Sequence, residues 1–173
     1  MNIGFLGCSK IGDSIIKALK ANSNVTLYGC AARDFKKAEE YKEKYGFKKA
    51  YNSYEEMVLD QNVEFVYIST LMCDHYKHAK LCLANGKPCL VEKAFTMNSK
   101  EADELIRLSK QKNLFLGEAI WTRYMPSRKV INELIASGII GNVYMLSANL
   151  SYKIDEKERL IKKELGGGIL LDC

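Results

Sequence analysis

Residues 7–12, Gly-Cys-Ser-Lys-Ile-Gly, form a glycine turn between a short apolar run and a helical-looking segment. A strand, a glycine turn, a helix and a second strand within about 30 residues are typical of a βαβ unit that binds dinucleotides. The first glycine permits a tight bend, the second lets the backbone approach a pyrophosphate, and the third lets the helix pack on the strand. Ser9 replaces the middle glycine. The alternative is therefore a turn that only joins a strand to a helix.

The residues that follow the second apolar run indicate which dinucleotide would bind. NAD-selective folds carry an acid about 20 residues beyond the glycine turn, where it accepts hydrogen bonds from the ribose 2′-OH. Counting from Gly12 places Ala32 there, with Arg33 next. A small residue followed by arginine accommodates a 2′-phosphate, because the guanidinium binds phosphate in a forked geometry. The sequence favours NADP, with NAD as the alternative, and Asp34 is expected to cap the next helix.

Strand-like runs alternate with helix-like periodic segments along most of the chain. The predicted strands are residues 2–7, 25–31, 65–70, 88–92 and 114–117, and the predicted helices are residues 11–21, 34–45, 53–60, 74–85 and 98–112. This alternation requires parallel pairing and a sheet covered on both faces. The right-handed crossover rule then predicts an α/β fold, a doubly wound Rossmann sheet.

Beyond the last predicted strand the pattern changes. The sequence predicts a helix that begins at Pro126 and an alternating strand over residues 143–152. Three glycines and an apolar run close the chain at 166–173, and so short a run cannot sustain a helix alone. We therefore expect residues 1–118 to form the dinucleotide-binding domain. Residues 119–173 are expected to be the first part of a second α/β domain that is cut short.

The composition excludes several classes of protein. With 47% hydrophobic residues and two prolines, the 173-residue chain can bury a core. The net charge of +5 comes from lysines mixed with acids at helical spacing, which is typical of a solvated helix face and argues against nucleic acid as a partner. The six cysteines show no Cys-x-x-Cys spacing, so zinc is not expected.

The N-terminus and the apolar runs carry no targeting signal. The sequence starts Met-Asn-Ile-Gly, without the basic and apolar regions of a signal peptide. No apolar run approaches the roughly 20 residues of a membrane span. We expect a cytoplasmic protein with reduced cysteines and no membrane partner.

Further motifs follow the glycine turn in order. They are Tyr67-Ile68-Ser69-Thr70 with His75 and His78 after it, Glu92-Lys93-Ala94, Glu118-Ala119-Ile120-Trp121-Thr122-Arg123-Tyr124, and the Gly166 to Asp172 segment. Together they resemble the Gfo/Idh/MocA family of NAD(P)-dependent oxidoreductases, in which these motifs are the fourth strand, a Glu-Lys-Pro motif, the junction into the second domain and a Gly-Gly-Gly…Asp motif. Members are typically longer than this chain.

The resemblance implies hydride transfer between NADP and a hydroxyl or carbonyl group of a sugar, polyol or dihydrodiol. Lys93 would be the catalytic residue that takes or returns the hydroxyl proton, and Asp172 would hold substrate hydroxyls. A lysine acts in this way when desolvation or a nearby cation lowers its pKa. Glu92 precedes Lys93 and is expected to face the opposite side of the strand. Ala94 departs from the family proline, whose peptide bond is commonly cis, so the position of Lys93 depends on the backbone there.

The resemblance also assigns the dinucleotide to the glycine turn, the ends of three strands and the domain junction. The expected cofactor-binding residues are Gly7, Ser9, Lys10, Ile11, Gly12, Arg33, Ser69, Thr70, Leu71, His75, Glu92, Lys93, Trp121 and Arg123. No metal is expected, because His75 and His78 have no clear fourth ligand nearby. Trp121 and Tyr124 are three residues apart, so they could instead be core residues.

Three functions compete. The leading one is an oxidoreductase, or its N-terminal part, that acts on a small-molecule substrate and forms a homo-oligomer when full-length. The second is a relative that binds the nucleotide without turnover, which Ser9 and Ala94 favour. The third is a structural partner that binds no nucleotide. Because a truncated second sheet would expose strand edges, we also expect this chain to associate in solution.

Overall fold

The computed structural model describes residues 1–151 and 158–168. Its strands are β1 (Asn2–Leu6), β2 (Thr26–Ala31), β3 (Lys49–Tyr51), β4 (Phe65–Ile68), β5 (Cys89–Val91) and β6 (Leu116–Glu118). They form one six-stranded sheet of order β3-β2-β1-β4-β5-β6 in which every pair is parallel. This is the strand order of a Rossmann fold, so the predicted fold class is confirmed.

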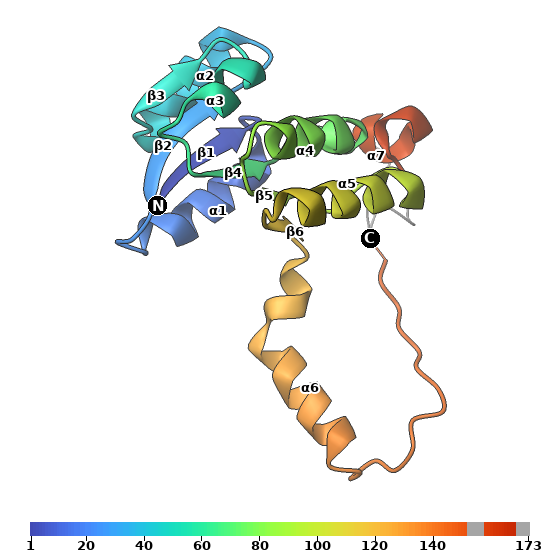
Figure 1. Ribbon diagram of the computed structural model, residues 1–173. Helices are drawn as coiled ribbons and strands as arrows, with labels where there is room; N and C mark the ends of the chain where they lie inside the picture. Colours follow the sequence, from blue (N-terminus) through green and yellow to red (C-terminus); the bar gives the residue numbers. More distant parts are fainter. Residues whose placement is uncertain (152–157, 169–173) are drawn as a thin grey trace.

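Helices connect the strands and cover the sheet (Figure 1). They are α1 (Lys10–Lys20), α2 (Phe35–Tyr45), α3 (Tyr54–Leu59), α4 (His75–Ala84), α5 (Ser99–Lys112), α6 (Pro126–Ala136) and α7 (Glu158–Ile161), with 3₁₀ helices η1 (Met72–Asp74), η2 (Trp121–Tyr124) and η3 (Lys163–Leu165). Asp34 caps α2 as expected, because its side chain accepts a hydrogen bond from the Lys36 N–H at 3.0 Å.

Alternation along the strands divides the core into two layers. Leu6 and Ile68 face the layer that contains α3, α4 and α5, and both are fully buried. Phe5 and Tyr67, one residue earlier on the same strands, face the layer that contains α1 and α2. Successive strand residues point to opposite faces, so each strand contributes to both layers. This two-sided burial fixes the register of the strands, and the register sets where their carboxyl ends lie.

Two segments differ from the sequence-based prediction. β3 was not predicted, because three residues at the edge of a sheet are too few to show an alternating pattern. The strand predicted for residues 143–152 is absent from the described part, residues 143–151, which is exposed and irregular. A strand needs a partner for its backbone groups, and no described segment lies beside this one to supply them.

The helix predicted at Pro126 is confirmed as α6, with proline at its first turn. It extends away from the sheet, and the chain then returns to the sheet at α7 and η3 (Figure 1). Gly166 lets the returning segment pack closely on Met72, because a Cβ there would lie 2.5 Å from the Met72 sulfur. The boundary between domains after residue 118 stays a prediction, although β6 ends at that residue. No helix in the described ranges combines the length and apolar character that crossing a bilayer requires.

Candidate functional site

The glycine turn is held between the ends of β2 and β4. Gly7 donates its N–H to the Ala31 carbonyl at 3.0 Å, and its own carbonyl accepts the Ser69 hydroxyl at 2.8 Å. Gly7 has a φ of 105°, and a Cβ would lie 2.9 Å from the Ser69 backbone. Only glycine fits this position, and residues 7–11, which lead into α1, line the cleft described below.

Ser9 and Gly12 occupy the second and third glycine positions of the dinucleotide-binding motif. The Ser9 hydroxyl accepts a hydrogen bond from the Gly12 N–H at 3.4 Å, so it caps α1. A Cβ on Gly12 would lie 2.5 Å from the Tyr41 hydroxyl oxygen, and this hydroxyl donates to the Ser9 carbonyl at 3.3 Å. Gly12 therefore leaves room for the Tyr41 side chain of α2, and a Cβ there would also lie 3.5 Å from Phe5 of β1. Ser9 stabilises the helix start.

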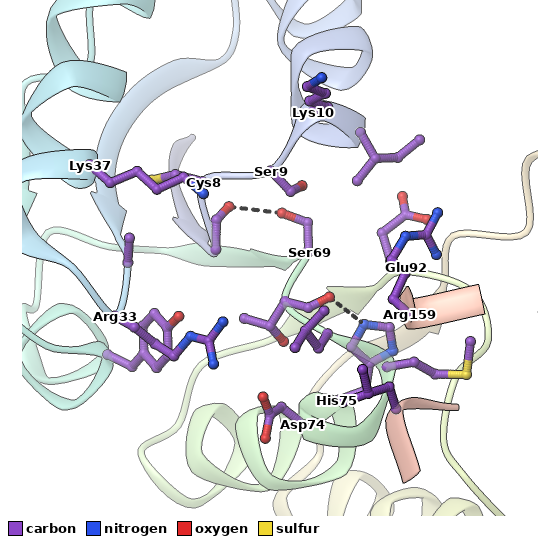
Figure 2. A pocket seen from close by; sticks show the side chains of 18 of the residues that line it. Cys8, Ser9, Lys10, Arg33, Lys37, Ser69, Asp74, His75, Glu92 and Arg159 are labelled. Atoms are coloured by element: carbon purple, nitrogen blue, oxygen red, sulfur yellow. Dashed lines mark hydrogen bonds between the residues drawn. The ribbon is translucent and has the colours of Figure 1, made fainter. Parts of the chain in front are cut away.

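A cleft of about 920 Å³ lies at the carboxyl ends of β1, β2, β4 and β5 (Figure 2). β1 pairs with β2 on one side and β4 on the other, so the cleft lies at the switch point of the sheet. The expected site residues that line it are Gly7, Ser9, Lys10, Ile11, Arg33, Ser69, Thr70, Leu71, His75, Glu92 and Lys93.

One end of the cleft is basic. Arg33 follows β2, and Lys37 lies one turn further, in α2. Their side chains line the cleft together with Tyr54 of α3. Burial raises the pKa of the Tyr54 hydroxyl, and the charge of Arg33 opposes this increase. Two cations beside the end of β2 suit an anion carried by the adenosine ribose.

The opposite end carries Glu92 and Lys93, which directly follow β5. The Tyr67 hydroxyl donates to Glu92 Oε1 at 2.5 Å, and the Lys93 N–H donates to Glu92 Oε2 at 3.3 Å. Glu92 and Lys93 both line the cleft, and both lie just beyond β5, which ends at Val91. That the two side chains face opposite sides stays a prediction. The Lys93–Ala94 peptide bond is cis, although alanine replaces the family proline.

Two buried histidines of α4 lie beneath the cleft. His75 Nδ1 lies 2.8 Å from the Ala94 carbonyl oxygen, and His75 Nε2 lies 3.3 Å from the Thr70 carbonyl oxygen. His78 Nδ1 lies 2.9 Å from Thr70 Oγ1. Burial lowers the pKa of both histidines, that of His78 to about 4. The two rings therefore connect α4 to the segments that follow β4 and β5. Among the described residues, no three His, Cys, Asp or Glu side chains gather as metal ligands.

Four expected residues are not among those that line the cleft. Gly12 acts through packing, as described above. Trp121 and Arg123 belong to η2, and Arg123 lines a separate groove against α6. Trp121 is 66% exposed and Tyr124 is 78% exposed, so the core alternative for this pair is wrong. Asp172 lies outside the described residues.

Other members of the cleft were not among the expected cofactor-binding residues. Cys8, Ala32, Asp34, Met72 and Asp74 adjoin expected residues in sequence, and Ala32 was expected beside the 2′-phosphate. Lys37 had a usable signal, because it lies four residues after Arg33 at the start of a predicted helix. Tyr54, Arg159 and Leu165 come from separate segments, so only the assembled fold brings them to the cleft. Cys8 lies in the glycine turn, where a hydrogen bond with the Cys30 thiol lowers its pKa.

The parallel sheet, the glycine turn and the cleft at the switch point define a dinucleotide-binding Rossmann domain. Comparison with known proteins agrees. Residues 1–119 match the GFO/IDH/MocA model, described as an oxidoreductase family with an NAD-binding Rossmann fold. The chain belongs to this oxidoreductase family.

Named relatives share much of this chain. A trans-1,2-dihydrobenzene-1,2-diol dehydrogenase of Xenopus tropicalis is 35% identical over 171 residues, which are 98% of this chain and 52% of the relative. A D-xylose 1-dehydrogenase (NADP(+)) of Hypocrea jecorina is 42% identical over 134 residues, which are 72% of this chain and 34% of the relative. The chain thus spans about half the length of the dihydrodiol dehydrogenase.

A solved structure shows the same fold. The 3-ketoreductase KijD10 of Actinomadura kijaniata, in complex with NADP and TDP-benzene, aligns with a TM-score of 0.85 and 22% identity. The alignment covers 99% of this chain and 53% of that protein. At this identity the likeness establishes the fold alone.

Proposed function

We propose that this chain is the dinucleotide-binding part of an NADP-dependent oxidoreductase that acts on a hydroxyl or carbonyl group of a dihydrodiol, sugar or polyol. One observation carries the proposal: the cleft joins a basic end at Arg33 and Lys37 to Lys93 at the other end, with the glycine turn between them. The substrate class is supported by the names of the relatives, which include dihydrodiol and D-xylose dehydrogenases.

Each part of the cleft has a chemical role in this proposal. The open backbone N–H groups at the start of α1 would hold the pyrophosphate. The guanidinium of Arg33 and the ammonium of Lys37 would hold the 2′-phosphate, which NAD lacks. Lys93 would exchange a proton with the substrate oxygen, while bound NADP supplies the carbon that accepts the hydride. Glu92, held by the Tyr67 hydroxyl, would fix the loop from which Lys93 projects.

We also expect the enzyme to be cytoplasmic, because free thiols such as Cys8 and Cys30 suit a reducing compartment. When full-length, the enzyme is expected to form a homo-oligomer. A relative that binds nucleotide without turnover is the second candidate, and Ser9 in the glycine turn is the observation in its favour.

Calorimetric titration with NADPH and with NADH tests the cofactor. We expect tighter binding of NADPH, and Arg33→Ala should weaken it by about tenfold or more, because a charge-assisted hydrogen bond contributes about 1.5–3 kcal/mol. NADH binding should change little. Lys36→Ala is the matched control, since Lys36 lies three residues after Arg33, in α2, but does not line the cleft. Equal affinity for the two nucleotides would contradict the 2′-phosphate site.

Turnover is tested separately. In a preparation that oxidises a dihydrodiol or D-xylose with NADP, Lys93→Met should lower kcat by about 10²–10⁴-fold, the usual contribution of a general acid or base. The Kd for NADPH should stay near its original value. A Lys93→Met variant that keeps its kcat would show that this lysine is not the proton relay. A protein that binds NADPH but oxidises no such substrate would favour the second candidate.

A further inference from the structure

Asp74 is an acid of the cleft that the proposed roles do not use. It ends η1 and directly precedes α4, where an aspartate commonly caps a helix. Its side chain makes no capping hydrogen bond. It lines the cleft instead, and Figure 2 shows its carboxylate turned toward the side where Arg33 lies.

Three acids line the cleft in the described part of the chain: Asp34, Asp74 and Glu92. Two of them have a structural hydrogen-bond donor. Asp34 accepts from the Lys36 N–H, and Glu92 accepts from the Tyr67 hydroxyl. A carboxylate without such a donor opposes the binding of an anionic dinucleotide, unless the ligand itself brings a hydrogen-bond donor to it. Asp74 is therefore placed to accept from the ligand.

The position of Asp74 limits which ligand group this is. Phosphates would occupy the glycine turn and the Arg33–Lys37 end, and the nicotinamide would lie at Lys93. Figure 2 shows the Asp74 carboxylate on the side of Arg33, which together with Lys37 makes the basic end of the cleft. Tyr54 and Leu71 also line the cleft. An adenine base bound beside a ribose phosphate at this end would have its polar edge within reach of the Asp74 carboxylate.

We infer that Asp74 recognises the adenine base of the dinucleotide by accepting a hydrogen bond from the exocyclic N6 amino group. This inference rests on the proposed dinucleotide-binding function. A hypoxanthine base carries a carbonyl oxygen at the same position, and that oxygen has no proton to donate. Its lone pairs would face the carboxylate oxygens, so Asp74 would reject it.

The test compares NADPH with reduced nicotinamide hypoxanthine dinucleotide phosphate by calorimetric titration. The unmodified chain should bind NADPH at least about tenfold more tightly, since a hydrogen bond to a charged group contributes about 1.5–3 kcal/mol. Asp74→Ala should bring the ratio of the two Kd values close to one. Asp74→Asn should bring it to one or below, because an amide can donate to the hypoxanthine carbonyl.

Asp103→Asn is the matched control. It removes the same charge from an exposed position on α5, outside the cleft, and should leave the ratio unchanged. If the unmodified chain binds both nucleotides equally, the inference is wrong while the proposed function stands. If it binds neither, both are wrong. A ratio that survives in Asp74→Ala would also overturn the inference, because another group would then distinguish the bases.

Discussion

His75 Nδ1 lies 2.8 Å from the carbonyl oxygen of Ala94, so a buried histidine of α4 holds the segment that carries Lys93. The second ring nitrogen lies 3.3 Å from the Thr70 carbonyl oxygen, at the end of β4. One side chain therefore joins the ends of two neighbouring strands. This connection explains how two loops that are distant in sequence form one continuous wall of the cleft.

Replacing His75 by leucine should destabilise the fold. The substitution keeps a comparable volume but removes the single N–H of the neutral imidazole, so a backbone carbonyl that accepts from it, with Ala94 the closer at 2.8 Å, loses its donor at a cost of about 1–3 kcal/mol. Urea unfolding followed by circular dichroism measures the loss. Tyr76→Phe on the same helix is the control, because the Tyr76 hydroxyl bonds to the exposed side chains of Lys80 and Glu104 and should matter by less than about 0.5 kcal/mol. Similar midpoints for both variants would contradict this role of His75.

The stability of the fold should fall as the pH decreases from about 6.5 to about 4. Burial lowers the pKa of His78 from 6.5 in the unfolded chain to about 4. In this interval the unfolded chain binds a proton that the folded chain does not, so acid favours unfolding, by up to about 3 kcal/mol. Above 6.5 both states are neutral at this residue and the full stability is present. His75, whose pKa burial also lowers, contributes in the same direction.

Urea unfolding at several pH values between about 4 and 7 measures this slope. His78→Gln should flatten it between about 5 and 6.5, and His75 would be the one histidine that still contributes, since the chain contains two. Asp60 does not contribute to the pH dependence of stability in this range. Hydrogen bonds from the Asn62 N–H and the Tyr51 hydroxyl lower its pKa, so its contribution is lost only below the usual aspartate range. An unchanged slope in His78→Gln would show that this imidazole is not buried in its neutral form.

A comparison of Gly7 with Gly46 distinguishes the cost of a close contact from the cost of a positive φ. Both have positive φ, 105° and 78°, but a Cβ on Gly7 would meet the Ser69 backbone at 2.9 Å, whereas one on Gly46 would meet no atom within 4 Å. Gly46→Ala should therefore cost only about 1 kcal/mol. Gly7→Ala should cost more than about 2 kcal/mol or displace the turn, and in either case abolish NADPH binding. Calorimetry and urea unfolding measure both effects, and equal losses would contradict the close contact.

The glycine turn and the alternation of strands and helices could be predicted because each depends on residues that are neighbours in sequence. The need for a glycine at position 12 follows from the spacing of the turn, whereas its contact with Tyr41 of α2 is seen only in the structure. The adenosine end of the cleft could not be predicted in full. Arg33, Tyr54 and Asp74 come from three different connections, and they meet only because β2 and β4 flank β1 in the sheet.

The differences from the prediction also have physical causes. The strand predicted for residues 88–92 ends at Val91, so Glu92 and Lys93 lie in the loop that lines the cleft. The alternating pattern of residues 143–152 is a real strand signal, but a strand forms only where neighbouring strands satisfy its backbone. The assignment of Trp121 and Arg123 to the cofactor came from the resemblance and stays a prediction.

The apolar face of α6 should make the chain associate in solution. Val130, Ile131, Leu134 and Ile135 lie at helical spacing and are between 46% and 54% exposed. A contiguous apolar surface of this kind favours contact with another chain. Light scattering should show a mass that increases with concentration, and the double variant Ile131→Lys with Leu134→Lys should reduce it.

Since α6 extends away from the sheet, this variant should keep its unfolding midpoint. Leu59→Lys, at an isolated exposed leucine on α3, is the control and should not change the association. A monodisperse monomer at high concentration would contradict the prediction.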